Sequence, residues 1–399
     1  MAGAAEDGFL PHPQARLFGP DGQKVALPQL QAANRPAVLP DRPALPALLA
    51  AFGQSFRIGA PEAPAPVTGF ETLTSGSTGT PRRIARSFAS WQAGFAVNAA
   101  LFGTGTGARV GVIGRLSQSL ALHGAVEALA LGAELHLLDC LRPDRQRAEL
   151  ARRGVTLLWA APAQLHLLTE APGPDLPALR WLLCGGAKLD SALRARVARL
   201  APHAALREFF GAAETSFITL ADAETPPETV GRPYPGVEIR LCDMSGQPAN
   251  EGRVQVRSPY LFNGYASDPG SARWLAGAGG WLDLPEIARW EGANLRLLGR
   301  RDRMFTVAGQ NLYPEAQESF ALGLPGVARF ALLPRPDGLR GQRPEAVVMG
   351  DATCAAVILQ ALRAEFGATL APRCLHWRAD WPLLPSGKTD LAALMRGLE

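Results

Sequence analysis

The sequence predicts an α/β protein with a large α/β part, a small antiparallel β subdomain and a small α+β C-terminal part. Apolar runs alternate with helical segments over residues 110–210, and short strands with turns follow from residue 230 onward. The 399 residues are 47% hydrophobic and 19% charged, which is typical of a globular protein with more than one compact unit.

Five apolar runs are expected to be buried strands of a largely parallel sheet, with helices between them. The expected strands are 110–113, 134–138, 155–159, 179–184 and 206–210, and the expected helices are 120–131, 144–153, 164–168 and 190–200. Ser87 is expected to cap another helix, on which Phe88, Trp91 and Phe95 share a face. Ligands of such sheets bind beyond the carboxyl ends of the strands.

The regions before and after this alternation differ from it in composition and in the expected secondary structure. Residues 1–68 are rich in Ala, Pro and Leu, with a helical run near 46–52 and a linker at 60–66. Short strands are expected at 236–242, 252–257 and 294–298. We therefore divide the chain into an N-terminal segment (1–68), a core domain (69–301) and a C-terminal domain (302–399).

Composition argues against several classes of protein. The net charge is +4 and the arginines are scattered, so no nucleic acid partner is expected. The five cysteines lie far apart, which argues against a zinc site or disulfides and favours a reducing, cytoplasmic location. The N-terminus shows no secretory signal pattern. Charged and histidine residues interrupt the apolar stretch 120–138, so no membrane span is expected.

One stretch combines hydroxyls, glycines and two cations, as a site for polyphosphate requires. It reads Thr74, Ser75, Gly76, Ser77, Thr78, Gly79, Thr80, Pro81, Arg82 and Arg83. Glycines bring backbone N–H groups close to an anion, hydroxyls add donors, and arginine adds a planar cationic fork. No lysine followed by Ser or Thr comes directly after the second glycine of this stretch, so this is not the usual P-loop. A Gly/Ser surface linker is the alternative interpretation.

The loop resembles the phosphate loop of the adenylate-forming superfamily, which includes acyl-CoA synthetases, peptide-synthetase adenylation domains and luciferases. Arg82 and Arg83 replace the Lys-Gly pair that closes the family's loop. The chain has fewer residues before this loop than its relatives usually have. Five later segments, in the family's order, extend the resemblance to residue 390.

Two of these segments follow predicted strands. Residues 183–189 resemble Ser-Gly-Gly-Ala-Pro-Leu, which implies that the backbone of Gly185, Gly186 and Ala187 lies along adenine. Residues 208–215 resemble Tyr-Gly-x-Thr-Glu. The resemblance makes Phe209, Phe210 and Gly211 part of the nucleotide site and Glu214 a Mg²⁺ ligand, while Ala213 replaces the usual Thr.

The other three segments lie near the C-terminal domain. Residues 280–287 resemble Gly-Trp-x-x-Thr-Gly-Asp, so Glu286 stands where the family's Asp accepts the ribose hydroxyls, with Asp283 as a substitute. In residues 299–315 the resemblance makes Arg300 a ribose or phosphate contact and Asp302 the hinge, while Thr306 replaces a Lys. Residues 383–390 resemble the segment that brings the catalytic lysine, here Lys388, into the cleft.

The resemblance implies an AMP-forming acid–thiol ligase that uses ATP and Mg²⁺. A carboxylate would attack the α-phosphate, releasing pyrophosphate, with Lys388, Arg82 and Thr78 as catalytic residues. Rotation about Asp302 would then admit coenzyme A, which attacks the acyl group. Alternatives are transfer to an acyl carrier protein's phosphopantetheine, or a degenerate relative that binds nucleotide without catalysis.

The acid itself is only partly indicated. In the family the acyl pocket is lined by regions that here contain Ser119, Ala121, Cys184 and Ala212, which favours an apolar acid, aryl or fatty. His123 is a candidate pocket residue, but we expect it to be a core histidine on a helix face. A homodimer is expected to cover sheet surface left bare by the short N-terminal segment.

Overall fold

The structure is a computed structural model that describes residues 8–27, 37–39, 44–59, 68–74, 82–266, 279–384 and 389–398. Its largest element is a nine-stranded sheet with the order β13-β12-β11-β10-β9-β7-β8-β1-β2. Its strands are β1 (Arg16–Phe18), β2 (Lys24–Val25), β7 (Arg109–Val112), β8 (Glu134–Leu137), β9 (Leu157–Ala160), β10 (Trp181–Gly185), β11 (Ala205–Ala212), β12 (Ser216–Ala221) and β13 (Arg232–Pro233). β1 and β7 to β11 pair in parallel, and the outer strands β2, β12 and β13 are antiparallel, so the expected parallel sheet is present.

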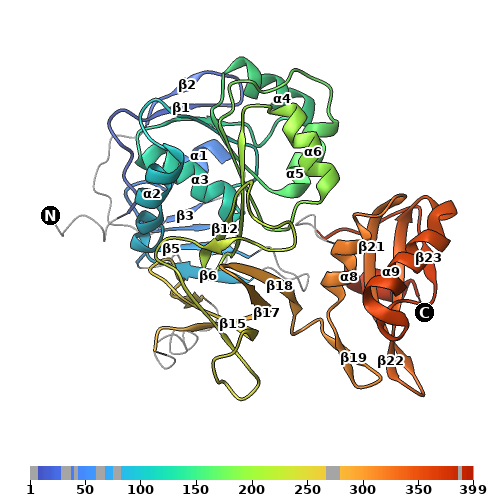
Figure 1. The fold of residues 1–399 in the computed structure, drawn as a ribbon. Coiled ribbons are helices and arrows are strands. Elements are labelled where there is room, and N and C mark those ends of the chain that lie inside the picture. The colour runs from blue at the N-terminus through green and yellow to red at the C-terminus, as the bar shows by residue number, and fades with distance from the viewer. Residues whose placement is uncertain are drawn as a thin grey trace.

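Helices cover both faces of this sheet (Figure 1). They are α1 (Ala44–Ala50), α2 (Phe88–Phe102), α3 (Ser119–Ala130), α4 (Pro143–Arg152), α5 (Pro162–Glu170) and α6 (Ser191–Leu200). The core formed with α1 to α3 includes Val110, Leu135 and Leu183, whereas Leu158 and Cys184 pack with α4 to α6. Neighbouring residues of one strand thus enter opposite cores, because side chains alternate along a strand.

Two smaller sheets adjoin this layer. One, with the order β16-β6-β5-β4-β3, contains β3 (Ala37–Leu39), β4 (Phe56–Ile58), β5 (Phe70–Leu73), β6 (Arg83–Arg86) and β16 (Gly264–Tyr265). The other is antiparallel and contains β14 (Glu238–Cys242), β15 (Glu251–Arg257), β17 (Leu282–Glu291) and β18 (Asn294–Arg300). The β5–β6 hairpin carries the predicted phosphate loop at its turn.

The C-terminal part stands beside the rest and joins it through the chain after β18 (Figure 1). Its sheet contains β19 (Phe305–Val307), β20 (Gln310–Leu312), β21 (Val327–Asp337), β22 (Gly341–Gly350) and β23 (Leu375–Trp377). Its helices are α8 (Pro314–Ala321), α9 (Ala355–Leu370) and α10 (Leu391–Arg396), with a 3₁₀ turn at Ala352–Cys354. Phe305, Leu332 and Ile358 belong to a core of its own.

The N-terminal segment contributes more structure than the sequence predicted. The expected helical run is present as α1, and the expected linker at 60–66 lies outside the described residues. The segment also supplies β1, which pairs with β8 (Leu17 beside Leu135), and two strands of the second sheet. Phe9 is fully buried, with its ring centroid 5.2 Å from that of Phe70 and 4.9 Å from that of Phe88. These strands of two or three residues are too short to show a hydrophobic period, so the prediction missed them.

Within the described residues, no helix combines the length and apolar character needed to cross a membrane.

A buried polar network lies between α2 and α3. Asn98 Nδ2 donates to Glu127 Oε1 at 2.6 Å, and the Tyr234 hydroxyl donates to Asn98 Oδ1 at 2.6 Å. Glu127 Oε2 has no hydrogen-bond partner in the described part of the chain. Burial raises the pKa of Glu127 to about 8, although the bond from Asn98 opposes this shift. The folded protein therefore holds Glu127 protonated at neutral pH.

We expect this group to make stability depend on pH. In the unfolded chain Glu127 releases its proton near its ordinary pKa of 4.5, whereas the folded protein keeps it up to about pH 8. The free energy of unfolding should therefore fall as the pH rises through this window. The free energy of unfolding can be measured with urea at about pH 5, about pH 7 and about pH 8.5. Its fall with rising pH should be smaller in Glu127→Gln than in the wild type. Glu365→Gln, on the exposed surface of α9, should keep the wild-type slope.

Candidate functional site

The predicted site residues that the structure describes gather where the second sheet meets the ends of β10 and β11. Phe262 N donates to Glu214 O at 2.8 Å, which joins the turn after β11 to the chain that enters β16. β16 pairs with β6, with Tyr265 beside Ile84. The phosphate-loop hairpin, the turn carrying Glu214 and the end of β10 therefore lie around one place.

The ends of the predicted phosphate loop are pinned together. Thr74 N donates to Arg82 O at 2.8 Å, and Arg82 N donates to Thr74 Oγ1 at 2.9 Å. The Arg82 guanidinium carbon lies 3.4 Å from the centroid of the Tyr265 ring. The other predicted loop residues, Ser75, Gly76, Ser77, Thr78 and Gly79, lie outside the described residues.

A buried arginine holds the turn that carries Glu214. Arg86 Nη1 donates to Ala213 O at 2.8 Å, and Nη2 donates to Ser216 Oγ at 2.6 Å and also to Tyr260 O. Burial lowers the pKa of Arg86 to about 9, and the nearby Glu214 carboxylate opposes this shift. Sequence reasoning missed Arg86, because nothing in its local pattern indicates a contact 127 residues along the chain.

Glu214 has a second neighbour that the sequence did not indicate. The Tyr265 hydroxyl donates to Glu214 Oε1 at 3.0 Å. Burial raises the pKa of Tyr265 to about 12, with the Glu214 charge and this hydrogen bond as smaller causes. Tyr265 therefore remains a donor at neutral pH.

Gly185 ends β10 and Gly186 follows it, and the backbone of these glycines suits a flat ligand. Gly185 pairs with Phe209 in register, and a Cβ on Gly185 would lie 2.3 Å from an atom of the Phe209 ring. Gly186 has a φ of +100°, and a Cβ there would meet nothing within 4 Å. Phe210 follows Phe209 and faces the opposite side of the strand. The backbone at Gly186 is thus open to a ring, as the resemblance implied for residues 185–187.

The predicted ribose and hinge residues form one ionic group. Arg300 Nη1 donates to Glu286 Oε1 at 3.2 Å, while Nε and Nη2 donate to the two Asp302 oxygens at 2.9 and 2.8 Å. Burial raises the pKa of Glu286, Arg300 opposes this shift, and the Glu214 charge adds a smaller upward contribution. The hydrogen bond from Arg300 lowers the pKa of Asp302. Glu286 therefore shares its electrostatic surroundings with both Glu214 and Asp302.

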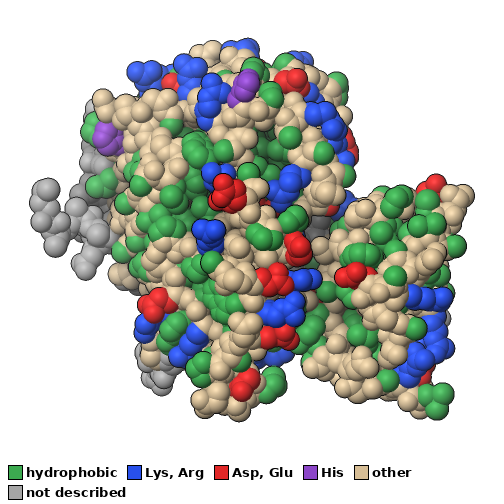
Figure 2. Space-filling view, viewed as in Figure 1, with side chains coloured by type: hydrophobic (Ala, Val, Ile, Leu, Met, Phe, Trp, Pro, Cys, Tyr) green, Lys and Arg blue, Asp and Glu red, His purple; other side chains and the backbone are tan. Residues whose placement is uncertain are grey.

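Asp283, the substitute for Glu286, is engaged elsewhere. Arg253 Nη1 donates to Asp283 at 3.0 Å, and Gln255 Nε2 donates to it at 3.1 Å. Figure 2 shows acidic and basic side chains gathered over β17 and β18, beside the C-terminal part. Asp283 belongs to this structural ion-pair network, which favours Glu286 for the ligand role.

Lys388 lies outside the described residues, but the chain on either side of its loop is held together. Leu383 and Thr389 form an isolated β-bridge, and Trp381 Nε1 donates to Thr389 Oγ1 at 3.0 Å. Asp390 N donates to Pro382 O at 2.9 Å. The described residues before and after positions 385–388 are thus fixed to one another.

Two residues named for the acyl pocket belong to the protein core. Cys184 is fully buried and packs with α4 to α6. His123 lies among aromatic rings, with centroid distances of 5.0 Å to Trp91 and 5.3 Å to Phe95. Burial lowers the pKa of His123 to about 3, so it stays neutral, as expected of a core histidine. The expectation that Cys184 lines the pocket is wrong, because it faces the opposite side of β10 from Gly185.

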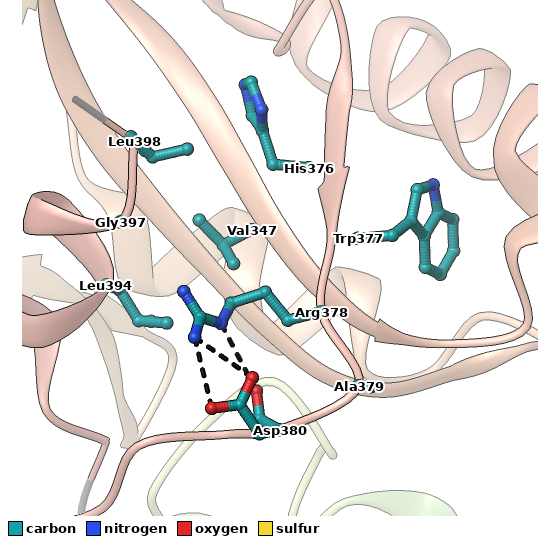
Figure 3. A pocket seen from close by; sticks show the side chains of 9 residues that line it. All are labelled: Val347, His376, Trp377, Arg378, Ala379, Asp380, Leu394, Gly397 and Leu398. Atoms are coloured by element: carbon teal, nitrogen blue, oxygen red, sulfur yellow. Dashed lines mark hydrogen bonds and ion pairs between the residues drawn. The ribbon is translucent and has the colours of Figure 1, made fainter.

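The C-terminal part carries hollows of its own. One of about 520 Å³ lies between β22, β23 and α10, where Arg378 is paired with Asp380 and Trp377 points away (Figure 3). Another of about 870 Å³ lies beside Asp302 and Met304. Neither is lined by Gly185, Gly186 or Glu214, so we place the candidate site at the ends of β10 and β11.

The described donors suit a magnesium-bound nucleotide. Among the described residues, no three His, Cys, Asp or Glu side chains form a metal-binding group. Mg²⁺ is often held by one or two carboxylates together with phosphate oxygens. Glu214 supplies such a carboxylate, with Arg82 nearby for phosphate charge and Glu286 as an acceptor for hydroxyls. The fold and these groups make this place, at the carboxyl ends of an α/β sheet, the candidate site for a nucleotide.

Comparison with known proteins identifies the family. The family model described as "AMP-binding enzyme" matches residues 60–266, more than half of the chain, and the protein belongs to this family. The predicted adenylate-forming family is thereby confirmed.

Individual relatives agree with this assignment. The chain is 29% identical to the uncharacterized acyl-CoA ligase YhfT of Bacillus subtilis, over 82% of this chain and 68% of that protein. It is 30% identical to the salicyl-AMP ligase / salicyl-S-ArCP synthetase of Mycobacterium tuberculosis, over 70% of this chain and 52% of that protein. The chain thus spans about half to two thirds of the length of these relatives. The predicted enzyme class, an AMP-forming ligase, agrees with their names.

A solved structure confirms the predicted fold class. The o-succinylbenzoate CoA synthetase of Bacillus subtilis, in complex with its acyl-adenylate intermediate, superimposes with a TM-score of 0.76 and 18% identity. The match covers 92% of this chain and 88% of that one.

The contact between Gly185 and Phe209 gives a direct test of the adenine position. In Gly185→Ala the new methyl group should push the Phe209 ring from its place, at a cost of about 1–3 kcal/mol. If the displaced ring raises the free energy of AMP binding by a similar amount, AMP should bind about tenfold more weakly, as calorimetry can measure. Gly338→Ala, where the added Cβ meets nothing within 4 Å, should leave AMP binding unchanged. Equal AMP affinity in both variants would contradict this position for adenine.

Proposed function

We propose that the protein activates a carboxylic acid with ATP to form an acyl-adenylate and pyrophosphate, then transfers the acyl group to a thiol. The observation that carries this proposal is the meeting of a pinned phosphate-type hairpin, the Glu214 carboxylate and an open glycine backbone at one place. Family membership and the names of the relatives support the same reaction.

Each described group has a proposed task. Thr74 and Arg82 hold the two ends of the phosphate loop together. The loop surrounds the β- and γ-phosphates with Ser75, Gly76, Ser77, Thr78 and Gly79. Glu214 binds Mg²⁺, which neutralises phosphate charge. Gly185, Gly186, Ala187, Phe209, Phe210 and Gly211 surround adenine. Glu286 accepts the ribose hydroxyls, and Arg300 orients it through the 3.2 Å hydrogen bond.

The C-terminal domain, residues 302–399, is proposed to bring Lys388 to the reacting oxygens and later to withdraw it. Asp302 is the proposed hinge, because it lies two residues after the end of β18, between the two parts of the chain. A single ammonium group stabilises charge that develops between the carboxylate and the α-phosphate. In this proposal the core domain binds the nucleotide, and the C-terminal domain turns about Asp302 to move Lys388 in and out.

Coenzyme A is the proposed acceptor, as the name of the Bacillus relative suggests. The name of the Mycobacterium relative, a salicyl-S-ArCP synthetase, keeps an acyl carrier protein as the alternative. The proposed acid is apolar, aryl or fatty, because Phe209 lies beside Gly185 and the regions that line the family's acyl pocket here contain the small residues Ala121 and Ala212. A cytoplasmic location and a homodimer remain predictions from the sequence.

A substitution at Lys388 tests the reaction. Lys388→Ala should lower ATP–pyrophosphate exchange by about 10²–10³-fold, because charge at the reacting oxygens loses its partner. AMP affinity should stay the same, since adenine and ribose are bound elsewhere. Lys24→Ala, an exposed lysine on β2, serves as the matched control.

The exchange assay should be run with aryl, short-chain and long-chain acids. Nucleotide binding by the wild type without exchange for any of these acids would instead favour a degenerate, non-catalytic relative.

A further inference from the structure

Three residues from distant parts of the chain form a continuous line of contacts in the site. The Arg82 guanidinium lies over the Tyr265 ring at 3.4 Å, and the Tyr265 hydroxyl donates to Glu214 at 3.0 Å. Backbone pairing of β16 with β6 and the Phe262–Glu214 hydrogen bond bring them together. Tyr265 therefore stands between the cation at the end of the loop and the carboxylate.

This arrangement keeps Arg82 and Glu214 from pairing directly with each other. Arg82 and Glu214 carry opposite charges, so a direct ion pair would occupy both groups and remove them from a ligand. In the described part of the chain no ion pair within 4.0 Å joins them. The cation instead rests on the face of an aromatic ring, which attracts cations, and the carboxylate accepts from the ring's hydroxyl.

We propose that Tyr265 is a positioning residue that separates Arg82 from Glu214 and aims the first at phosphate and the second at Mg²⁺. This inference rests on the proposed function. It also accounts for one departure from the family's motif, the arginine at position 82 in place of lysine. A planar guanidinium stacks on an aromatic face, which a compact ammonium group does less well.

The other charged groups near Glu214 make no described hydrogen bond to its carboxylate. Burial lowers the pKa of Arg86 and the Glu214 charge opposes this shift, but the hydrogen bonds of Arg86 go to Ala213, Ser216 and Tyr260. Burial raises the pKa of Glu286 and the Glu214 charge adds to this shift, and no hydrogen bond between these two carboxyl groups is described. Among the contacts described, the Tyr265 hydroxyl is the side-chain donor that reaches the Glu214 carboxylate.

A comparison of AMP with ATP·Mg²⁺ binding tests the proposal. AMP lacks the β- and γ-phosphates, so it should not report on Arg82 or on the metal ligand. Tyr265→Phe keeps the ring under Arg82 and loses the hydroxyl, and should weaken ATP·Mg²⁺ binding about threefold to tenfold. Tyr265→Leu also loses the ring and should weaken it by about tenfold or more. Both variants should bind AMP as the wild type does, as measured by calorimetry.

A double-mutant cycle shows whether Tyr265 acts through Arg82. In an Arg82→Ala background the step from Tyr265→Phe to Tyr265→Leu should cost almost nothing, because the cation that needs the ring is absent. Additive losses of ATP·Mg²⁺ affinity would overturn the proposed role of the ring. Arg82→Lys should fall between the wild type and Arg82→Ala.

Tyr260→Phe is the matched control, since it also removes one phenolic hydrogen bond, to Pro235 O at 2.7 Å. It should leave the ratio of ATP·Mg²⁺ to AMP affinity unchanged. If Tyr265→Leu does not fold, Tyr265→Phe and its cycle with Glu214→Gln still test the hydroxyl's role. Equal losses for AMP and ATP·Mg²⁺ would show a merely structural tyrosine and overturn the proposal.

The outcomes separate this inference from the proposed function. Wild-type exchange activity together with an unchanged affinity ratio in both Tyr265 variants would overturn the inference alone. A wild-type protein that binds neither nucleotide would overturn both.

Discussion

The site depends first on the hydrogen bonds of one buried arginine. Arg86 belongs to the hairpin that carries the phosphate loop, and it donates to Ala213 O at 2.8 Å and Ser216 Oγ at 2.6 Å, on either side of Glu214. Removing such a group would leave several acceptors unsatisfied, which is costly inside a protein. Because its planar fork has fixed directions, Arg86 sets the distance between the second sheet and the turn after β11.

The sequence predicted the main sheet well because its signals are local. The runs around β7 to β11 are apolar and the helices between them have a clear period, so each could be placed within a few residues. β1 and β4 were missed because they are short and pair with partners far along the chain, as Leu17 does with Leu135. The order of the sheet comes from such long-range pairing, which no local pattern contains.

In the candidate site too, local motifs were predicted from the sequence and long-range contacts were not. Motif resemblance selected Glu214, Glu286, Arg300 and Asp302, and the structure brings the last three into one ionic group. Tyr265 and Arg86 escaped notice, because their importance lies in contacts across 51 and 127 residues of sequence. The wrong placement of Cys184 has a simpler cause: strand alternation puts it on the other face of β10 from Gly185, and the motif does not state which face is which.

The Arg300 group shows how a departure from a motif is accommodated. Glutamate at position 286 reaches further than aspartate, and here it meets Arg300 across the β17–β18 pair, where the two residues are in register. The same guanidinium holds both oxygens of Asp302, so three of its five donors are used in one plane. A rigid fork that binds two carboxylates fixes their separation. Glu286 and the residue where the C-terminal part begins are therefore geometrically coupled, and movement of the Asp302 side chain must break charge-assisted hydrogen bonds.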